Sequence, residues 1–238
     1  AGLIEVCDRA ARPDEGSWKE SVGYVPDKPV FYDWMSGSGF LDLIARFYPA
    51  WDADFAGELA DRFRLDLDER LKRYSQGNRV KLSLVAALAH RPGLALFDEP
   101  TAGLDPVVRT EVFDVLGRLL ENGDMTVFYS THILDDLHRL ADRLVFLDSG
   151  RIKLDAAKDT LVDSWRRIRF QFPDEVSEIP GTVSHTSQGR VHDLVTSEGA
   201  EAVAVLSSMG AEAIRPTGMP LEEIAVHIMK GEGHGRGS

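Results

Sequence analysis

Residues 94–100 read LALFDEP, an apolar run followed by two carboxylates and a proline. Such an uninterrupted apolar run is typical of a central strand in a parallel sheet, which is buried on both faces. Because α/β folds bind ligands at the carboxyl ends of these strands, Asp98 and Glu99 mark a candidate site. Asp98 could hold Mg²⁺, and Glu99 could accept a proton from an attacking water. In an isolated DEP triplet, the two carboxylates more often only end the strand before a turn.

A second buried strand is predicted at residues 126–130, TVFYS, and His132 follows it. The segment from Arg109 to Leu120 has the pattern of a crossover helix between the two strands. Parallel strands joined in this way end at the same edge of a sheet, so we expect Asp98 and His132 to lie at one edge. A histidine after a strand is, taken alone, more often a capping or surface group.

Two further signals flank the LALFDEP strand. Ser75, Gln76 and Gly77 directly precede an amphipathic helix, where a serine cap leaves first-turn N–H groups free to face an anion. The alternative is a plain helix cap with no ligand. After the strand, TAGLDP supplies Asp105 in a turn, with Pro106 placed to begin the next helix.

The alternation of short apolar strands with helical segments through residues 1–155 predicts an α/β domain with a parallel sheet. Residues 156–230 have a different pattern, with alternating apolar residues from Ile168, a hairpin at 182–196 and two amphipathic helices. This pattern predicts a small α+β unit without catalytic groups.

Two details belong to this second part of the chain. His185 and His192 flank the predicted hairpin turn, and we expect both to be exposed. The glycine-rich tail, residues 231–238, is expected to be disordered.

The composition argues against a nucleic-acid-binding protein, a disulfide-bonded protein and a membrane-spanning protein. The chain has 238 residues, with 27 Lys and Arg against 39 Asp and Glu, a net charge of −12. Binding DNA or RNA usually requires a basic face, so the sequence predicts no nucleic-acid partner. The single cysteine, Cys7, cannot form an internal disulfide, which fits a reducing cytosol. No apolar run approaches the roughly 18 residues of a membrane span.

The order of these motifs resembles that of the ATP-binding subunits of ABC transporters. YSQGN at 74–78 resembles the signature motif, LALFDEP the Walker B strand, TAGLDP at 101–106 the D-loop and STH at 130–132 the switch histidine. The segment at 23–36, GYVPDKPVFYDWMS, resembles the one that carries the Q-loop and touches the membrane partner. The resemblance covers about residues 1–155 and implies the α/β class, as a P-loop NTPase-like ABC ATPase core with a small C-terminal α+β appendage. It also implies a helical subdomain within that core, at about residues 40–90.

The resemblance also implies roles for individual residues. Asp98 would organise Mg²⁺, Glu99 would polarise the attacking water, and His132 would contact the γ-phosphate of ATP. Ser75 and Gly77 would touch a nucleotide bound to the opposite protomer, and Asp105 would communicate between the two sites. The implied nucleotide-binding set is Ser75, Gln76, Gly77, Asp105 and Asp27. The implied partners are a membrane permease and a second ATP-binding subunit, identical or different, at the cytoplasmic face of the cell membrane.

The sequence departs from the family pattern in three places. No GxxxxGK[ST] phosphate loop is present, since none of the 21 glycines is followed by lysine. The chain therefore resembles an N-terminally incomplete ABC ATPase domain, without the first strands and the P-loop. Asp27 stands where many members have glutamine, and the signature reads SQGN instead of the commoner SGGQ.

Two functions remain open from the sequence. The first is an ATP-hydrolysing subunit that powers a separate permease. The second is a P-loop-less, non-catalytic remnant or interaction subunit that contributes its signature motif to a partner. A third function, a soluble ABC protein acting on nucleic acid or ribosomes, is disfavoured by the acidic charge and the single core. In either of the first two cases we expect the 238-residue chain alone to be inactive, because a P-loop holds the phosphates.

Overall fold

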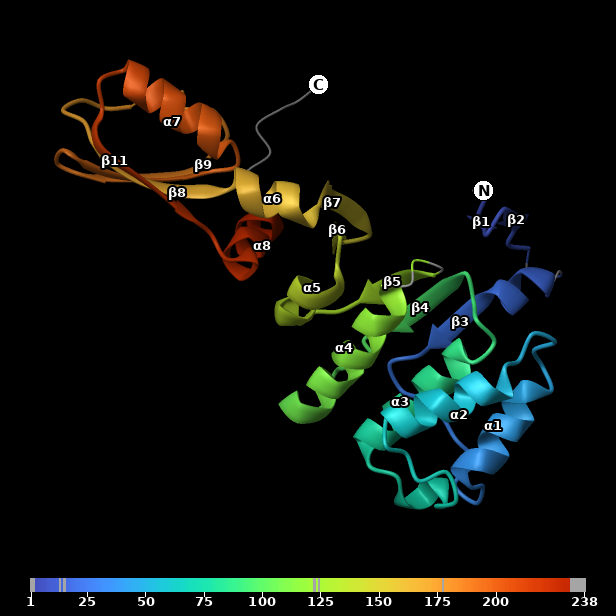
Figure 1. Ribbon diagram of the computed structural model, residues 1–238. Helices are drawn as coiled ribbons and strands as arrows, with labels where there is room; N and C mark the ends of the chain where they lie inside the picture. The colour runs from blue at the N-terminus through green and yellow to red at the C-terminus, as the bar shows by residue number, and fades with distance from the viewer. Residues whose placement is uncertain are drawn as a thin grey trace. The chain divides into compact units, whose positions relative to one another are not determined.

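The computed structural model describes residues 3–231 apart from residues 13, 15, 122, 124 and 177. The chain forms two compact units, Ala1–Leu140 and Ala141–Ser238 (Figure 1). The division falls earlier than the boundary expected near residue 155, because two strands at 143–157 pair with each other and pack within the second unit. The predicted disordered tail lies outside the described residues, except for Gly231.

The sheet of the first unit has three parallel strands in the order β3 (Val22–Val25), β4 (Leu94–Asp98) and β5 (Thr126–Ser130). Asp98 pairs in register with Ser130, two residues before His132. The expectation that Asp98 and His132 lie at the same edge of the sheet is therefore confirmed. A short antiparallel pair, β1 (Glu5–Val6) and β2 (Arg9–Ala10), precedes the sheet.

Helices pack on one face of this sheet. They are α3 (Gln76–Leu88), α4 (Pro106–Leu120) and α5 (Leu134–Leu140). Strand residues facing them, such as Phe97, belong to the main core with helix residues such as Leu84 and Leu116. Side chains alternate between the two faces along a strand, so every second residue of each strand points toward the helices and joins this core.

The opposite face of the same sheet carries an apolar row. Tyr24, Leu96 and Phe128 are in register across the three strands, and Tyr24 and Phe128 are 55% and 62% exposed. Parallel sheets are almost always covered on both faces. Within the residues that the structure describes, this sheet therefore has one apolar face that remains open to solvent.

The helical part of the first unit follows β3. It consists of α1 (Gly37–Ala45), α2 (Ala53–Arg62), a short 3₁₀ turn at Leu71–Arg73 and the beginning of α3. Another 3₁₀ turn, Ser17–Ser21, lies directly before β3. Ser36 and Asp52 cap α1 and α2 by accepting hydrogen bonds from backbone N–H groups. Leu41, Leu59 and Phe63 bury the apolar sides of these helices in the same core as the sheet. The helical subdomain thus shares its core with the strands that carry the site.

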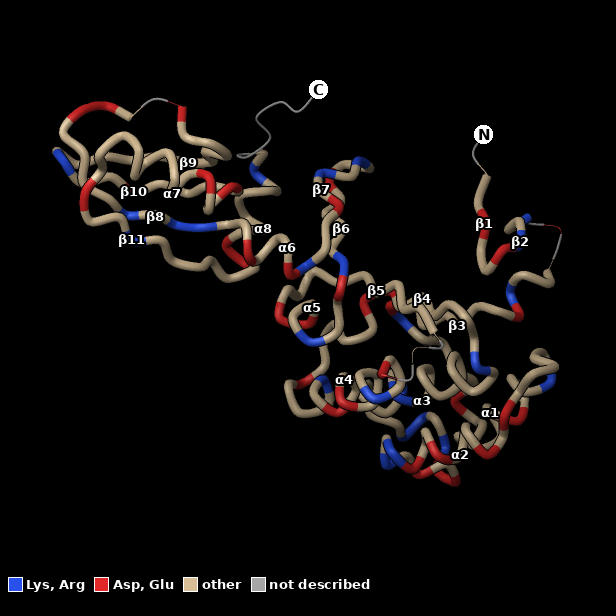
Figure 2. Tube along the Cα trace, turned by 45° about the horizontal axis from the view of Figure 1, so that its top comes forward, with Lys and Arg blue, Asp and Glu red and all other residues tan. Residues whose placement is uncertain are grey.

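The second unit is built around an antiparallel sheet with the strand order β11-β8-β10-β9. Its elements are β6 (Arg143–Asp148), β7 (Arg151–Ala157), α6 (Lys158–Ser164), β8 (Arg166–Gln171), β9 (Thr182–Gln188), β10 (Val191–Thr196), α7 (Gly199–Ser208), β11 (Glu212–Gly218) and α8 (Leu221–Lys230). Figure 2 shows the basic stretch of β8, which alternates with buried Ile168 and Phe170.

The expected exposure of both hairpin histidines is wrong for His192, which is only 3% exposed. His192 lies on the same side of β10 as buried Leu194 and stacks on Phe170, with ring centroids 5.0 Å apart. Its Nε2 donates to the carbonyl of Phe172 at 3.2 Å, so its Nδ1 is left to accept from His185 Nε2 at 3.0 Å. The period of the strand, not the nearby turn, decides this burial.

Candidate active site

The carboxyl edge of the parallel sheet holds Asp98 and Glu99 through Ser130. Ser130 Oγ donates to Asp98 Oδ1 at 2.8 Å. The backbone N–H of Glu99 lies 3.1 Å from both the carbonyl oxygen and the Oγ of Ser130. Glu99 has a φ of 48°, a left-handed conformation that is strained for a residue with a side chain. Ser130 therefore fixes the strained turn, a role that the sequence analysis did not assign to it.

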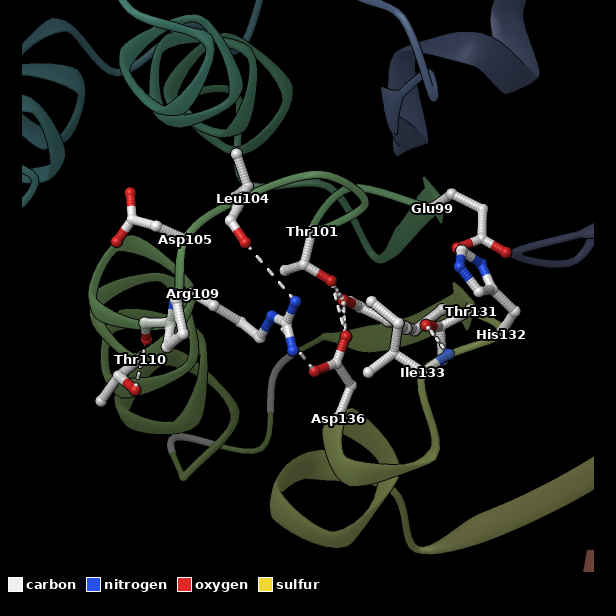
Figure 3. Close-up of polar contacts among 12 residues, drawn as sticks. Glu99, Thr101, Leu104, Asp105, Arg109, Thr110, Thr131, His132, Ile133 and Asp136 are labelled. Carbon is white, nitrogen blue, oxygen red and sulfur yellow. Dashed lines mark hydrogen bonds and ion pairs between the residues drawn. The ribbon is translucent and has the colours of Figure 1, made fainter. Parts of the chain in front are cut away.

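Glu99 and His132 meet at this edge, as Figure 3 shows. Glu99 Oε2 lies 2.8 Å from His132 Nδ1. The His132 side chain is 73% exposed and that of Glu99 is 26% exposed, so the imidazole reaches farther into solvent. A carboxylate paired with an imidazole offers a proton acceptor and an oriented polar group to a substrate outside the edge.

Asp98 supplies the carboxylate that could contribute to a Mg²⁺ site. Its Oδ1 accepts from Ser130, and the Ser130 hydroxyl and the Asp98 carboxylate are the oxygen donors that Mg²⁺ prefers. Within the described residues, no three His, Cys, Asp or Glu side chains cluster as a metal site. Mg²⁺ usually takes one or two carboxylates and completes its shell with water and substrate phosphates, so Asp98 fits a site of that kind.

The signature segment lies against the turn that follows Glu99. Ser75 caps α3 by accepting from the N–H of Asn78 at 3.2 Å. Gln76 Nε2 donates to the carbonyl of Ala102 at 3.2 Å, and the N–H of Ala102 donates to the carbonyl of Glu99 at 3.0 Å. The start of α3 is thus connected by one hydrogen bond to the turn that Ala102 closes with Glu99.

Gly77 and Asp105 bring the starts of α3 and α4 together. Gly77 is buried, and a Cβ added to it would lie 2.9 Å from Val108 Cγ1. Asp105 caps α4 by accepting from the N–H groups of Val107 and Val108 at 3.0 and 3.1 Å. Packing against Val108 by itself accounts for a glycine at position 77.

Asp27 stands apart from these groups. It is exposed and follows the carboxyl end of β3 by two residues, at the same edge of the sheet as Asp98. Among the described residues, none makes a hydrogen bond or ion pair with Asp27. The structure therefore brings Asp98, Glu99 and His132 together and leaves Asp27 as a separate group at the edge.

A buried polar cluster behind the edge was not expected from the sequence. Thr101 Oγ1 lies 2.6 Å from Asp136 Oδ2 and 2.7 Å from the Tyr129 hydroxyl, and Arg109 Nε lies 3.9 Å from Asp136 Oδ1 (Figure 3). Burial raises the pKa of Tyr129, and the charge of Asp136 contributes to the rise, so the phenol keeps its proton. Asp136 lies four residues after His132, but His132 precedes α5, so the spacing carries no helical i, i+4 signal that could have revealed the cluster.

A cavity of about 370 Å³ lies between α4 and α5, beside this buried cluster. Arg109, Phe113 and Asp136 line it, whereas Glu99 and His132 do not. The catalytic candidates therefore lie on the surface of this chain at the sheet edge, outside the cavity.

Comparisons with known proteins identify the family of the chain. Residues 1–102 match the family model described as ABC transporter. The ABC transporter ATP-binding protein YtrB of Bacillus subtilis is 30% identical over 159 residues, which are 67% of this chain and 54% of that protein. The molybdenum import ATP-binding protein ModC of Thiobacillus denitrificans is 33% identical over 164 residues, 63% of this chain and 45% of that protein. The chain spans about half the length of the curated relatives it matches.

A solved structure, titled as the ATP binding subunit of an ABC transporter, has the same fold with a TM-score of 0.61 and 26% identity. The alignment covers 68% of this chain and 70% of that one. Within the described residues, no helix has the length and apolar character needed to cross a membrane. The family match, the relatives and the solved structure together show that the chain carries an ABC transporter nucleotide-binding domain.

Proposed function

We propose that this chain belongs to the ATP-hydrolysing subunit of an ABC transporter, and that the subunit powers a separate membrane permease from the inner face of the cell membrane. The observation that carries the proposal is the Glu99–His132 pair, 2.8 Å apart, directly beside Asp98 at the carboxyl edge of the sheet. Hydrolysis of a phosphoanhydride requires mostly positioning and charge stabilisation, which such a fixed edge provides.

Each group has a defined task in this proposal. Glu99 accepts the proton of the attacking water, and His132 donates a hydrogen bond to the γ-phosphate. Asp98 would help to hold Mg²⁺, which when bound would supply neutralisation of the phosphate charge. Ser75 and its neighbours at the start of α3 face a nucleotide held by a second ATP-binding subunit, identical or different, when the two close around ATP. Ser75 and Gln76 are exposed and available for that contact, whereas Gly77 is buried against Val108.

The open face of the parallel sheet supports one more part of the proposal. The 238 residues contain no phosphate loop. Tyr24, Leu96 and Phe128 form an exposed apolar row on a parallel sheet, and parallel sheets are normally covered by other elements on both faces. We assign both the loop and the cover to polypeptide outside these 238 residues. Calorimetry of the chain alone with Mg-ATP should then detect weak binding or none, and micromolar affinity would contradict this part.

An exposed aromatic surface supports the permease contact. Tyr32 and Trp34 lie in the loop after β3, with their ring centroids 6.0 Å apart, and Trp34 is 71% exposed. Phe31 of the same loop packs edge-on against Phe40 of α1, with ring centroids 4.8 Å apart, and so fixes the loop to the helix. Exposed apolar clusters of this kind often mark protein contacts. Replacing Trp34 by Asp should reduce copurification of the permease without lowering the unfolding temperature of the chain.

One experiment separates hydrolysis from the alternative, a non-catalytic subunit that contributes only its signature segment. ATPase rates would be compared for the assembled transporter carrying His132→Ala or Ser75→Arg in this chain. A hydrolysing subunit requires both residues, so both substitutions should lower the rate. A non-catalytic subunit requires only Ser75, so a normal rate with His132→Ala and a low rate with Ser75→Arg would favour the alternative.

A further inference from the structure

Behind the catalytic edge, one buried carboxylate connects segments that are far apart in the sequence. Asp136 is 2% exposed and lies in α5, four residues after His132. Its Oδ2 accepts from Thr101 Oγ1 at 2.6 Å, and Thr101 is two residues after Glu99 and fully buried. The same carboxylate therefore contacts the turn that carries Glu99 and belongs to the segment that carries His132.

Two more residues complete this arrangement. The Tyr129 hydroxyl donates to Asp136 Oδ2 at 3.3 Å, which fixes α5 to the end of β5. The Arg109 guanidinium lies 3.9 Å from Asp136 Oδ1 and donates to the carbonyl of Leu104 at 3.5 Å, next to Asp105. Figure 3 shows how these contacts converge on Asp136 from the Glu99 turn and from α4.

The cost of burying these groups indicates that the cluster has a role besides packing. A buried charge pair is weak evidence for stability, because apolar residues of similar volume often replace it without loss. The pair here is also imperfect, since Asp136 Oδ1 and Arg109 Nε are buried without a hydrogen-bond partner among the described residues. What the carboxylate does provide is a fixed orientation for the two segments that it joins.

We propose that Asp136 is a positioning residue for hydrolysis, which acts through Thr101 to hold the Glu99 turn at a fixed place relative to His132. The inference rests on the proposed function, in which Glu99 and His132 act on ATP. Asp136 itself touches no reacting atom, because it lies behind the turn and is buried. A displacement of about 1 Å in a catalytic group can cost on the order of 100-fold in rate, so a loose turn would be costly.

The first test uses the 238-residue chain without nucleotide. Hydrogen exchange would be measured for the N–H groups of Glu99, Ala102 and Leu104, which bond within the turn or to β5. With Thr101→Val, which removes the hydroxyl, we expect these three to exchange about tenfold faster, while the N–H of Val85 in α3 is unchanged. Thr101→Ser keeps the hydroxyl and should restore slow exchange. Equal acceleration at Val85, or no acceleration in the turn, would overturn the proposal.

The second test uses the assembled ATPase. Thr101→Val and Asp136→Ala should each lower kcat by about 10- to 100-fold and change KM by less than about threefold. Because both remove the same link, the double variant should be no slower than the slower single variant. The matched control is Asp135→Asn, a substitution of the exposed neighbour on the same helix, which should leave kcat unchanged.

Two further comparisons make the outcome unambiguous. If Asp136→Ala does not fold, Thr101→Val against Thr101→Ser carries the test, and equal rates for these two would refute the positioning role. Glu99→Gln, measured in parallel, separates this proposal from the proposed function. A loss of activity with Glu99→Gln and normal activity with Thr101→Val would reject only the positioning role. Normal activity with Glu99→Gln would reject the function on which it rests.

Discussion

The three-stranded sheet of the first unit and the four-stranded sheet of the second unit place their polar groups differently. In the three-stranded sheet, β3, β4 and β5 run in one direction, so the residues after β4 and β5 meet at one edge and form the candidate site of Asp98, Glu99, Ser130 and His132. In the second unit, neighbouring strands run in opposite directions and their ends alternate between two edges. Its paired imidazoles, His185 and His192, stack against the sheet on Phe170. Strand direction therefore decides whether loop residues converge.

The largest expected effect tests the edge of the parallel sheet. In the assembled ATPase, Glu99→Gln keeps the size of the side chain but removes its basicity. We expect hydrolysis to fall by about 10²- to 10⁴-fold with little change in ATP affinity, because in the proposed function Glu99 acts on the water and not on the bound phosphates. Steady-state ATPase rates and nucleotide binding would be measured together.

The matched control for Glu99→Gln lies in the other unit. Glu201→Gln makes the same chemical change at an exposed position at the start of α7 and should leave turnover unchanged. Near-normal hydrolysis with Glu99→Gln would mean that Glu99 only shapes the turn before Pro100. The convergence of polar residues at the edge of the parallel sheet would then not indicate a catalytic site.

The next prediction concerns the independence of the two units. Ile168 is fully buried in the core of the second unit, so Ile168→Ala should destabilise that unit by about 2 to 5 kcal/mol. Calorimetry should show the transition of the second unit at a lower temperature and that of the first unit unchanged. Val226→Ala, at a half-exposed position on α8, serves as the control with a small effect. A joint shift of both transitions would show that the units unfold together.

A smaller effect is expected at the start of α4. Asp105 accepts hydrogen bonds from two backbone N–H groups, so Asp105→Ala should cost about 1 kcal/mol of the stability of the first unit. Asp105→Asn keeps the accepting oxygen and should recover most of the loss. Urea unfolding of both variants checks the prediction, and equal stability of the alanine variant and the wild type would leave Asp105 with no structural role.

The smallest effect is a pH dependence confined to the second unit. Partial covering of its imidazole by the neighbouring rings lowers the pKa of His185 below its ordinary value near 6.5, and the nearby His192 lowers it further. The unfolded chain therefore binds the proton more readily than the folded one, so stability is complete above about pH 6.5 and decreases as the pH falls below that value. Thermal unfolding between pH 5 and 8 should show this for the second unit.

His185→Gln provides the comparison for the pH effect. Glutamine keeps a donor toward His192 but does not titrate, so the pH dependence should become shallower. The wild type and the variant should differ least at pH 8, where His185 is neutral in both states. An unchanged pH dependence in the variant would assign the effect to other groups.

The sequence by itself predicted the two central strands and the polar residues that follow them. Apolar runs of four or five residues predicted β4 and β5, and the helix between them predicted parallel strands, because a crossover returns the chain to the same edge. The carboxylates after β4 and the histidine after β5 therefore had to share that edge. The turn and cap residues Ser75 and Asp105 were also readable, since a short polar side chain before a helix is a local signal.

Only the tertiary structure decided which side chains touch. Ser130 holding the Glu99 turn, Gln76 bonding to Ala102, and Asp136 joining Thr101 to α5 are contacts between residues 26 to 35 positions apart. Local sequence patterns do not reveal contacts between residues so far apart in the chain, because these partners come together only when α3, α4 and α5 pack on the sheet. His192 was expected to be exposed beside a turn and is buried, because the strand period places it on one side of β10 and the fold packs that side next to Phe170 of the neighbouring strand.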